Sequence, residues 1–186
     1  MKRLAPLLLL FAACGEDHAK VPAPPPPGTA LVLSAHVVSN LSDAAIVGVM
    51  VSFFEGEIEQ AKIAHDRAQD PRVGAFADEV RIDDAAALDR MQNLARNLDL
   101  DPTKTSALRQ HIDIENENAL LRLTAASGDD FDTLYVDLLA KQGIEVIKII
   151  DDQLMPAAKD PALRAELEMA RALIAHHVMQ AKDLLR

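Results

Sequence analysis

The sequence contains very little of the cysteine, tryptophan, tyrosine and glycine on which several protein classes depend. Its 186 residues include one cysteine, no tryptophan, one tyrosine and seven glycines. The single cysteine, Cys14, excludes an intramolecular disulfide and any metal site built from several cysteines. Because aromatic residues are scarce while alanine and leucine are abundant, the composition favours packed helices over sheets.

Basic residues and the common catalytic motifs are also scarce. The chain carries 19 Lys and Arg against 29 Asp and Glu, a formal net charge of −10, which argues against binding nucleic acid by charge. It has no glycine-rich phosphate loop, no Gly-x-Ser-x-Gly elbow, and none of the Glu-x-x-His pairs of ordinary di-iron bundles. We therefore predict no catalytic residues.

Residues 1–14 read as a lipoprotein-type signal peptide. Lys2 and Arg3 precede a short apolar run, and two alanines lead into Cys14. The run is too short to span a bilayer and fits a secretory signal. The ending resembles a bacterial lipobox, with Phe11 as a departure from its commonest pattern, so we expect Cys14 to carry a lipid. An ordinary signal peptide with an unused cysteine is the alternative. Removal of Lys2 and Arg3 would change the net charge from −10 to −12.

Residues 15–39 are expected to form a proline-rich tether. The stretch 21–28 reads VPAPPPPG, which favours an extended polyproline conformation and cannot build a core. Residues 29–39 are apolar, and the sequence does not decide between a strand-like arm and an unstructured lead-in. We expect an exported, periplasmic protein that is anchored to the outer or inner membrane, with that membrane and envelope proteins as its partners. Nothing in the sequence indicates an oligomeric state.

Residues 40–186 are predicted to form an all-α, ferritin-like, up-down four-helix bundle. Apolar residues at helical spacing predict helices over about 42–68, 71–98, 131–154 and 161–185, and an accessory helix over about 107–126. Asp70-Pro71 and Asp160-Pro161 are helix starts, and Met155-Pro156 is expected to end the third long helix. Two antiparallel hairpins joined by one long crossover is the connectivity of ferritin-like bundles.

Each long helix carries a polar residue on its apolar face near mid-length. These residues are Glu57, Asp83 or Asp84, Gln142 with Glu145, and His177. Mid-helix positions of an up-down bundle lie at one level, where inward oxygen and imidazole groups can hold a metal ion. Glu57, Asp83, Asp84, Glu145 and His177 are therefore candidate ligands of iron, manganese or zinc. Two alternatives remain: a buried polar cluster without metal, with Gln142 as part of a polar core, or side chains that rotate to the helix flanks.

The domain resembles an exported bacterial family of unknown function with a ferritin-like helical bundle, whose members are often labelled outer-membrane proteins. The resemblance covers about Asn40 to Leu185. It rests on Leu41-Ser42-Asp43-Ala44, on Phe76-Ala77 followed by Asp83, and on Ser127-Gly128 followed by Phe131-Asp132 and Tyr135.

The resemblance also implies a set of polar residues in the helices. The family pattern has Asp-His in the second helix, Asp-His in the third and a histidine in the fourth, where this chain has Asp83-Asp84, Gln142-Gly143 and His177. Glu57 matches an acidic position of the family. Two of the three histidines are thus absent, which indicates a degenerate metal site. We expect a lipid-anchored envelope protein with a structural or interaction role and no cofactor. A metal-binding redox or storage bundle is the alternative.

Overall fold

Five long helices make up most of the part of the chain that the structure describes. The structure is a computed structural model, and it describes residues 41–128 and 130–186, which contain no β-strand. The long helices are α1 (Asp43–Arg67), α2 (Pro71–Asn97), α3 (Ala107–Ala125), α4 (Asp130–Ile149) and α6 (Pro161–Leu184). The predicted signal segment 1–14 and tether 15–39 lie outside the described residues. None of the helices in the described part has the length and apolar composition of a membrane span.

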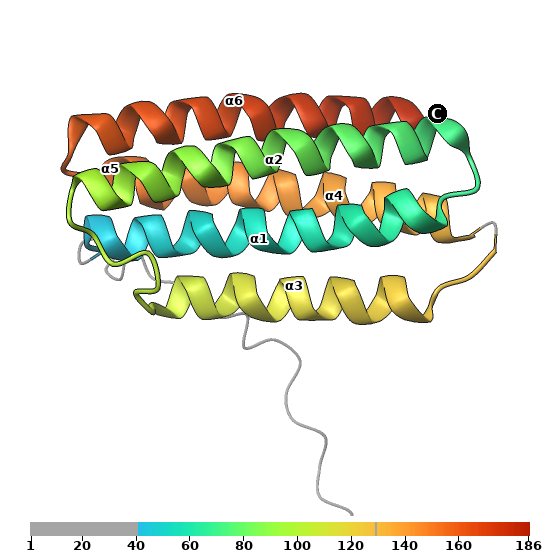
Figure 1. The fold of residues 1–186 in the computed structure, drawn as a ribbon, viewed down its shortest axis with the longest axis horizontal. Helices are drawn as coiled ribbons and strands as arrows, with labels where there is room; N and C mark the ends of the chain where they lie inside the picture. Colours follow the sequence, from blue (N-terminus) through green and yellow to red (C-terminus); the bar gives the residue numbers. More distant parts are fainter. Residues whose placement is uncertain (1–40, 129) are drawn as a thin grey trace, which may run out of the picture. The chain divides into compact units, whose positions relative to one another are not determined.

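The helices form two antiparallel hairpins joined by a long crossover (Figure 1). α1 packs against α2, and α4 packs against α6. The crossover contains α3, which runs alongside α1 in the same direction and contacts both α1 and α4. This connectivity confirms the predicted ferritin-like bundle with an accessory helix.

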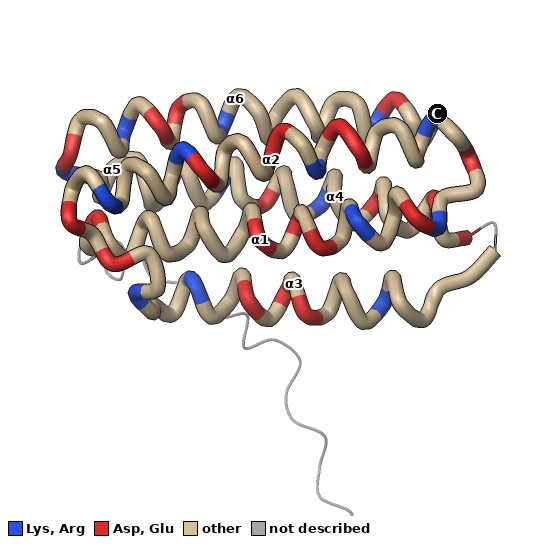
Figure 2. The backbone as a smooth tube through the Cα atoms, in the orientation of Figure 1, with Lys and Arg blue, Asp and Glu red and all other residues tan. Residues whose placement is uncertain are grey.

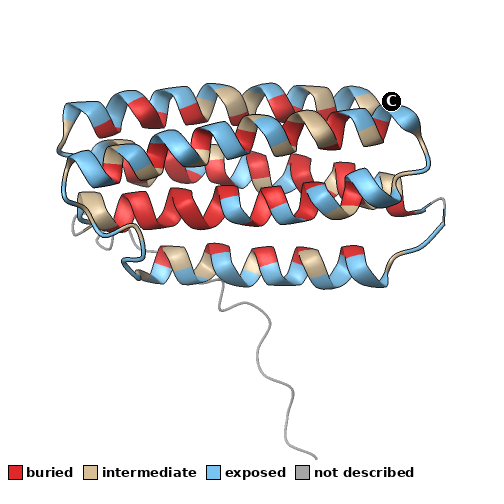
Figure 3. Cartoon of the chain, viewed as in Figure 1, coloured by how far each residue is buried: buried red, intermediate tan, exposed pale blue. Residues whose placement is uncertain are grey.

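The apolar core has two clusters, one toward each end of the bundle. The first includes Phe53, Phe54, Met91, Val146, Leu163 and Ile174, and the second includes Ala61, Phe76, Val80, Phe131, Tyr135, Leu139 and Ala181. Figure 3 shows the buried positions facing inward along every long helix. On α1 and α2 a buried polar residue lies between the two clusters, and on α6 a buried polar residue lies four positions before Ala181 of the second cluster. The middle of the bundle is therefore polar.

The helix starts are set by local capping, which the sequence predicts for the two Asp-Pro starts. The Ser42 hydroxyl accepts from the Ala45 N–H at 3.2 Å at the start of α1. At α2 and α6, the carboxylates of Asp70 and Asp160 cap the first turn, with a proline in that turn. Such caps satisfy N–H groups that have no partner inside the helix, so each helix begins where its cap stands.

At each end of the bundle, an aspartate of one hairpin accepts hydrogen bonds from the loop of the other hairpin. Asp43 on α1 accepts hydrogen bonds from the backbone N–H groups of Lys159 and Asp160, at 2.9 and 3.1 Å. At the other end, Asp132 on α4 accepts hydrogen bonds from the backbone N–H groups of Gln69 and Asp70 in the loop before α2, at 3.1 and 2.6 Å. Each hairpin thereby fixes the loop of the other.

The predicted end of the third long helix at Met155-Pro156 is wrong. After α4 the chain continues through a π-helical turn, η2 (Ile150–Leu154), into the short helix α5 (Met155–Ala157). The Met155 N–H donates to the carbonyl of Ile150, five residues earlier. A proline cannot donate to the residue four positions before it, and its ring crowds that carbonyl. The wider turn accommodates Pro156 without ending the helix.

Candidate functional site

Three of the predicted site residues meet in the middle of the bundle. Glu57 from α1, Asp84 from α2 and His177 from α6 are 4 %, 0 % and 1 % exposed. Glu57 and Asp84 lie between the two apolar clusters along their helices, and His177 lies among the last α6 residues of the first cluster. Because α2 packs antiparallel against both α1 and α6, and mid-helix positions of an up-down bundle lie at one level, these polar residues form a single layer, as the sequence predicts.

His177 lies between an inner and an outer carboxylate. Its Nδ1 is 3.7 Å from Oδ1 of the buried Asp84, and its Nε2 is 3.5 Å from Oδ2 of Asp83. Both separations are at or beyond the limit of an ordinary hydrogen bond. The Asp83 side chain is 41 % exposed, so it stands at the boundary between the polar layer and solvent. The imidazole is also packed edge-on against the ring of Phe76, with ring centroids 6.4 Å apart.

The layer contains two polar groups that the sequence does not single out. Tyr135, which reads as part of the apolar stripe of α4, is fully buried, and burial, with Glu57 and Asp84 nearby, raises the pKa of its hydroxyl. Gln60 is 2 % exposed and lies one helical turn beyond Glu57. Two signals mark these residues in retrospect: Tyr135 is the only tyrosine of the chain, and Gln60 falls three positions after Glu57 on the same helix face.

Burial shifts the proton equilibria of this layer. Desolvation, with the nearby Asp84, raises the pKa of Glu57 well above its ordinary value. Desolvation, with the nearby Asp83, does the same to the pKa of Asp84. For His177 desolvation lowers the pKa, and Asp83 partly opposes that shift. All three shifts favour the uncharged form, which is the form that a low-dielectric interior tolerates.

Most polar atoms of the layer have no hydrogen-bond partner in the described part of the protein. The unpartnered atoms are Glu57 Oε1, Gln60 Nε2, both carboxylate oxygens of Asp84, Tyr135 Oη, and both ring nitrogens of His177. A buried polar group without a partner costs about 1–3 kcal/mol. Such a concentration of unpartnered atoms is unusual in a folded core, and it distinguishes this layer from an ordinary apolar interior.

Glu145 and Gln142 do not join the layer, which corrects the prediction for α4. The Glu145 carboxylate is 2.7 Å from Nε2 of His111 on α3, in a contact that solvent reaches. The Gln142 amide is half-buried and reaches the carbonyl of Glu115 on α3, at 3.4 Å. Both side chains therefore face the crossover helix, because α4 turns Leu139, the small Gly143 and Val146 toward the interior.

Gly143 marks a close helix contact. A Cβ at this position would lie 2.5 Å from Cγ2 of Val178 and 3.3 Å from Cγ2 of Ile174. The sequence leaves open whether this glycine vacates space beside Gln142 or lets two helices approach. The structure shows the second, because side chains of α6 occupy the space.

The chemistry of the layer fits a metal ion only in part. Two carboxylates and one imidazole are a suitable donor set for a divalent transition metal. However, residues 41–128 and 130–186 contain no group of three or more His, Cys, Asp or Glu side chains close enough together to hold an ion. Glu57, Asp84 and His177 would have to move toward a common centre to bind one.

The family is identified by a match over most of the chain. Among curated proteins, none matches this sequence. The crystal structure of a DUF305 protein from Streptomyces coelicolor, described as secreted, has the same fold, with a TM-score of 0.64 at 15 % identity. The similarity covers 77 % of this chain and 91 % of that one. The family model for a domain of unknown function, DUF4142, matches residues 29–184, and the chain therefore belongs to that family.

Proposed function

We propose that this is a lipid-anchored protein of the bacterial cell envelope with a structural or interaction role, and that its polar layer is the remnant of a metal site. The lipobox-like ending at Cys14 supports the anchor, and residues 15–39 supply a spacer between anchor and domain. The structural neighbour described as secreted is in keeping with export.

One observation carries the non-enzymatic part of the proposal. Glu57, Asp84 and His177 have pKa values that burial shifts, and their side chains are at most 4 % exposed. An acid–base catalyst must come within hydrogen-bond reach of its substrate, directly or through a water molecule. Side chains so deeply buried are out of reach of a substrate, so the proposal confines their role to the interior of the bundle.

Replacing Cys14 with serine tests the anchor. The thiol is the only group on the chain that can accept the lipid, so the Cys14→Ser protein should leave the membrane fraction and appear in the soluble exported fraction. The measurement is fractionation followed by immunoblotting, with Ser39→Ala as a control that should fractionate like the wild type. A Cys14→Ser protein that stays with membranes would contradict the lipoprotein assignment.

Metal binding is the second candidate function, and the unpartnered atoms of the polar layer favour it. An ion between Glu57, Asp84 and His177 would provide a partner for oxygen and nitrogen atoms that have none among the described protein groups. Bound metal would supply Lewis-acid or redox chemistry at that point. The protein side chains would hold the ion and exclude bulk water from it.

Thermal unfolding with added iron, manganese or zinc separates the two candidates. The proposed function predicts no change in the melting temperature of the wild type. A bound ion would stabilise the fold by about 2.7 kcal/mol at one hundred times its dissociation constant, and His177→Gln would abolish that gain. His176→Gln is the control, because the His176 side chain is next to His177 in the sequence but is half exposed. His177→Gln itself should cost about 1–3 kcal/mol, because it removes a buried ring that packs edge-on against Phe76.

A further inference from the structure

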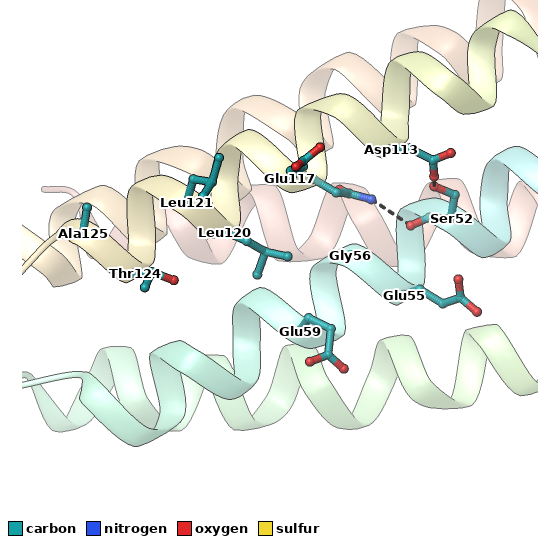
Figure 4. A pocket seen from close by; sticks show the side chains of 11 residues that line it. Ser52, Glu55, Gly56, Glu59, Asp113, Glu117, Leu120, Leu121, Thr124 and Ala125 are labelled. Carbon is teal, nitrogen blue, oxygen red and sulfur yellow. Dashed lines mark hydrogen bonds between the residues drawn. The ribbon is translucent and has the colours of Figure 1, made fainter.

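A groove on the outer side of the bundle runs along the junction of α1 and α3. It has a volume of about 680 Å³, within the usual range of binding pockets. Figure 4 shows it between the two helices, with Leu120, Leu121 and Ala125 on the α3 side. The groove begins where the helices meet. Gly56 gives room to the Asn116 side chain, and the Asn116 amide donates to the carbonyl of Ser52 at 2.8 Å.

The floor of the groove is apolar and open to solvent. The side chain of Leu121 is 63 % exposed, the largest value among the large hydrophobic residues of the described part, and Leu120 next to it is half-buried. In Figure 4 Leu120 points toward α1, and the exposed Leu121 extends the apolar lining over α3. Exposed apolar side chains that line a groove are a feature of surfaces that bury apolar groups of a partner.

Carboxylates line both rims of this floor. Glu55 and Glu59 come from α1, and Asp113 and Glu117 come from α3, each pair four residues apart. No lysine or arginine lines the groove. Figure 2 shows these acidic stretches side by side on the two helices.

Only part of this charge is compensated within the protein. Lys62 pairs with Glu59 at 2.6 Å, and Arg109 lies 3.7 Å from Asp113. Glu55 and Glu117 have no ion-pair partner within residues 41–128 and 130–186. Two uncompensated carboxylates therefore stand on opposite rims of an apolar floor, and a positively charged partner would complement both.

We propose that this groove binds a basic amphipathic helix of another protein. Residues four apart on a helix face are about 5–6 Å apart, so a partner helix with Lys or Arg at the same spacing would match each acidic rim. Its apolar stripe would cover Leu120 and Leu121, which is the helix-in-groove mode of recognition. A second copy of this chain is a poor occupant, because its net charge of −10 and its own acidic rims would repel the groove.

This inference rests on the proposed interaction role and is tested separately from it. The full chain carrying Cys14→Ser is titrated with a fluorescent 18-residue peptide that has leucines at i, i+3, i+4 and i+7 and lysines on both flanks. A scrambled peptide of the same composition lacks the apolar stripe. The amphipathic peptide should bind about tenfold or more tightly than the scrambled one. Its affinity should fall as salt is added, because the rim charges are exposed.

Matched variants locate the binding. Glu55→Gln with Glu117→Gln should weaken binding about five- to tenfold, in line with two exposed charge pairs. Leu121→Ser should also weaken binding, because it removes an apolar side chain from the lining of the groove. The control variants are Glu168→Gln with Asp152→Asn, and Met169→Ser, at exposed positions outside the groove, and they should bind like the wild type.

Several outcomes would overturn the assignment. Equal affinity for the scrambled peptide, or an equal loss in the control variants, would mean attraction by net charge alone. A dimer in sedimentation that Leu121→Ser dissolves would assign the groove to a second copy, and binding that appears only on deletion of residues 29–39 would assign it to that segment. Absence of peptide binding would remove the groove assignment and leave the fractionation result for Cys14→Ser and the metal titrations to judge the proposed function.

Discussion

Replacing Phe131 with alanine is expected to lower the free energy of unfolding by about 3–5 kcal/mol. The ring is 2 % exposed and belongs to the apolar cluster that also contains Phe76 and Tyr135. The Arg67 guanidinium lies 4.6 Å from the centroid of the ring. The same guanidinium donates to the carbonyl of Leu123 at 2.8 Å, near the end of α3. The substitution therefore opens a cavity and removes a contact that holds Arg67 against the crossover.

Urea unfolding followed by circular dichroism measures this loss. Leu121→Ala is the matched control, because that side chain is 63 % exposed, and it should cost less than about 1 kcal/mol. Phe76→Ala should resemble Phe131→Ala, since Phe76 is 5 % exposed in the same cluster. A loss below about 1 kcal/mol for Phe131→Ala would show that the apolar stripe of α4 does not face the core.

The ends of the helices could be predicted from the sequence because they are set by local chemistry. The serine cap and the two Asp-Pro starts act within one turn of the chain, and the structure places α1, α2 and α6 within one or two residues of the predicted bounds. The failure at Met155-Pro156 has a local cause of another kind. A proline excludes the ordinary hydrogen bond, but a single π-helical turn can replace it, and no residue type identifies that turn in advance.

The composition of the polar layer was harder to predict because it depends on contacts between distant helices. Glu57, Asp84 and His177 fall three or four residues from apolar residues, on the apolar face of their helices, so the sequence pattern predicts their burial. Glu145 and Gln142 follow the same spacing, yet they face α3. No local sequence pattern shows where α3 packs against α4. A glycine at an interior position obscured the true inner face of α4, because it carries no apolar side chain to mark that face.

Asp84→Asn is expected to make the protein more stable above neutral pH and to flatten the dependence of its stability on pH. Because burial raises the pKa of Asp84, the folded state holds a proton that the unfolded chain releases near pH 4. Stability must then fall as pH rises from about 4 toward the folded-state pKa, by about 1.4 kcal/mol for each pH unit per proton. Glu57 acts in the same direction. The amide of asparagine keeps the shape of the side chain and has no charge to bury.

The other titrating groups leave a clear window for this measurement. His177, whose pKa is lowered, costs stability only below about pH 6.5, where the unfolded chain binds a proton that the folded state excludes. The carboxylates whose pKa is lowered by partners, such as Asp151 beside Arg171, lose their contribution only near pH 4 and below. Above about pH 6.5 neither of these contributions changes further, so the raised pKa values of the two buried acids are the source of a loss of stability with rising pH.

Urea unfolding at pH 5, 7 and 9, with chelator present to remove metal, measures the effect. The wild type should lose stability toward pH 9, and the advantage of Asp84→Asn over it should grow by at least about 1.4 kcal/mol across that range, which is a tenfold change in the folding equilibrium. Asp152→Asn is the control, because the same chemical change is then made at a solvent-exposed position outside the polar layer. An Asp84→Asn protein that is destabilised equally at every pH would mean that Asp84 is ionised in the folded state. The layer would then be a charged site that holds a cation, which is what the metal-binding candidate requires.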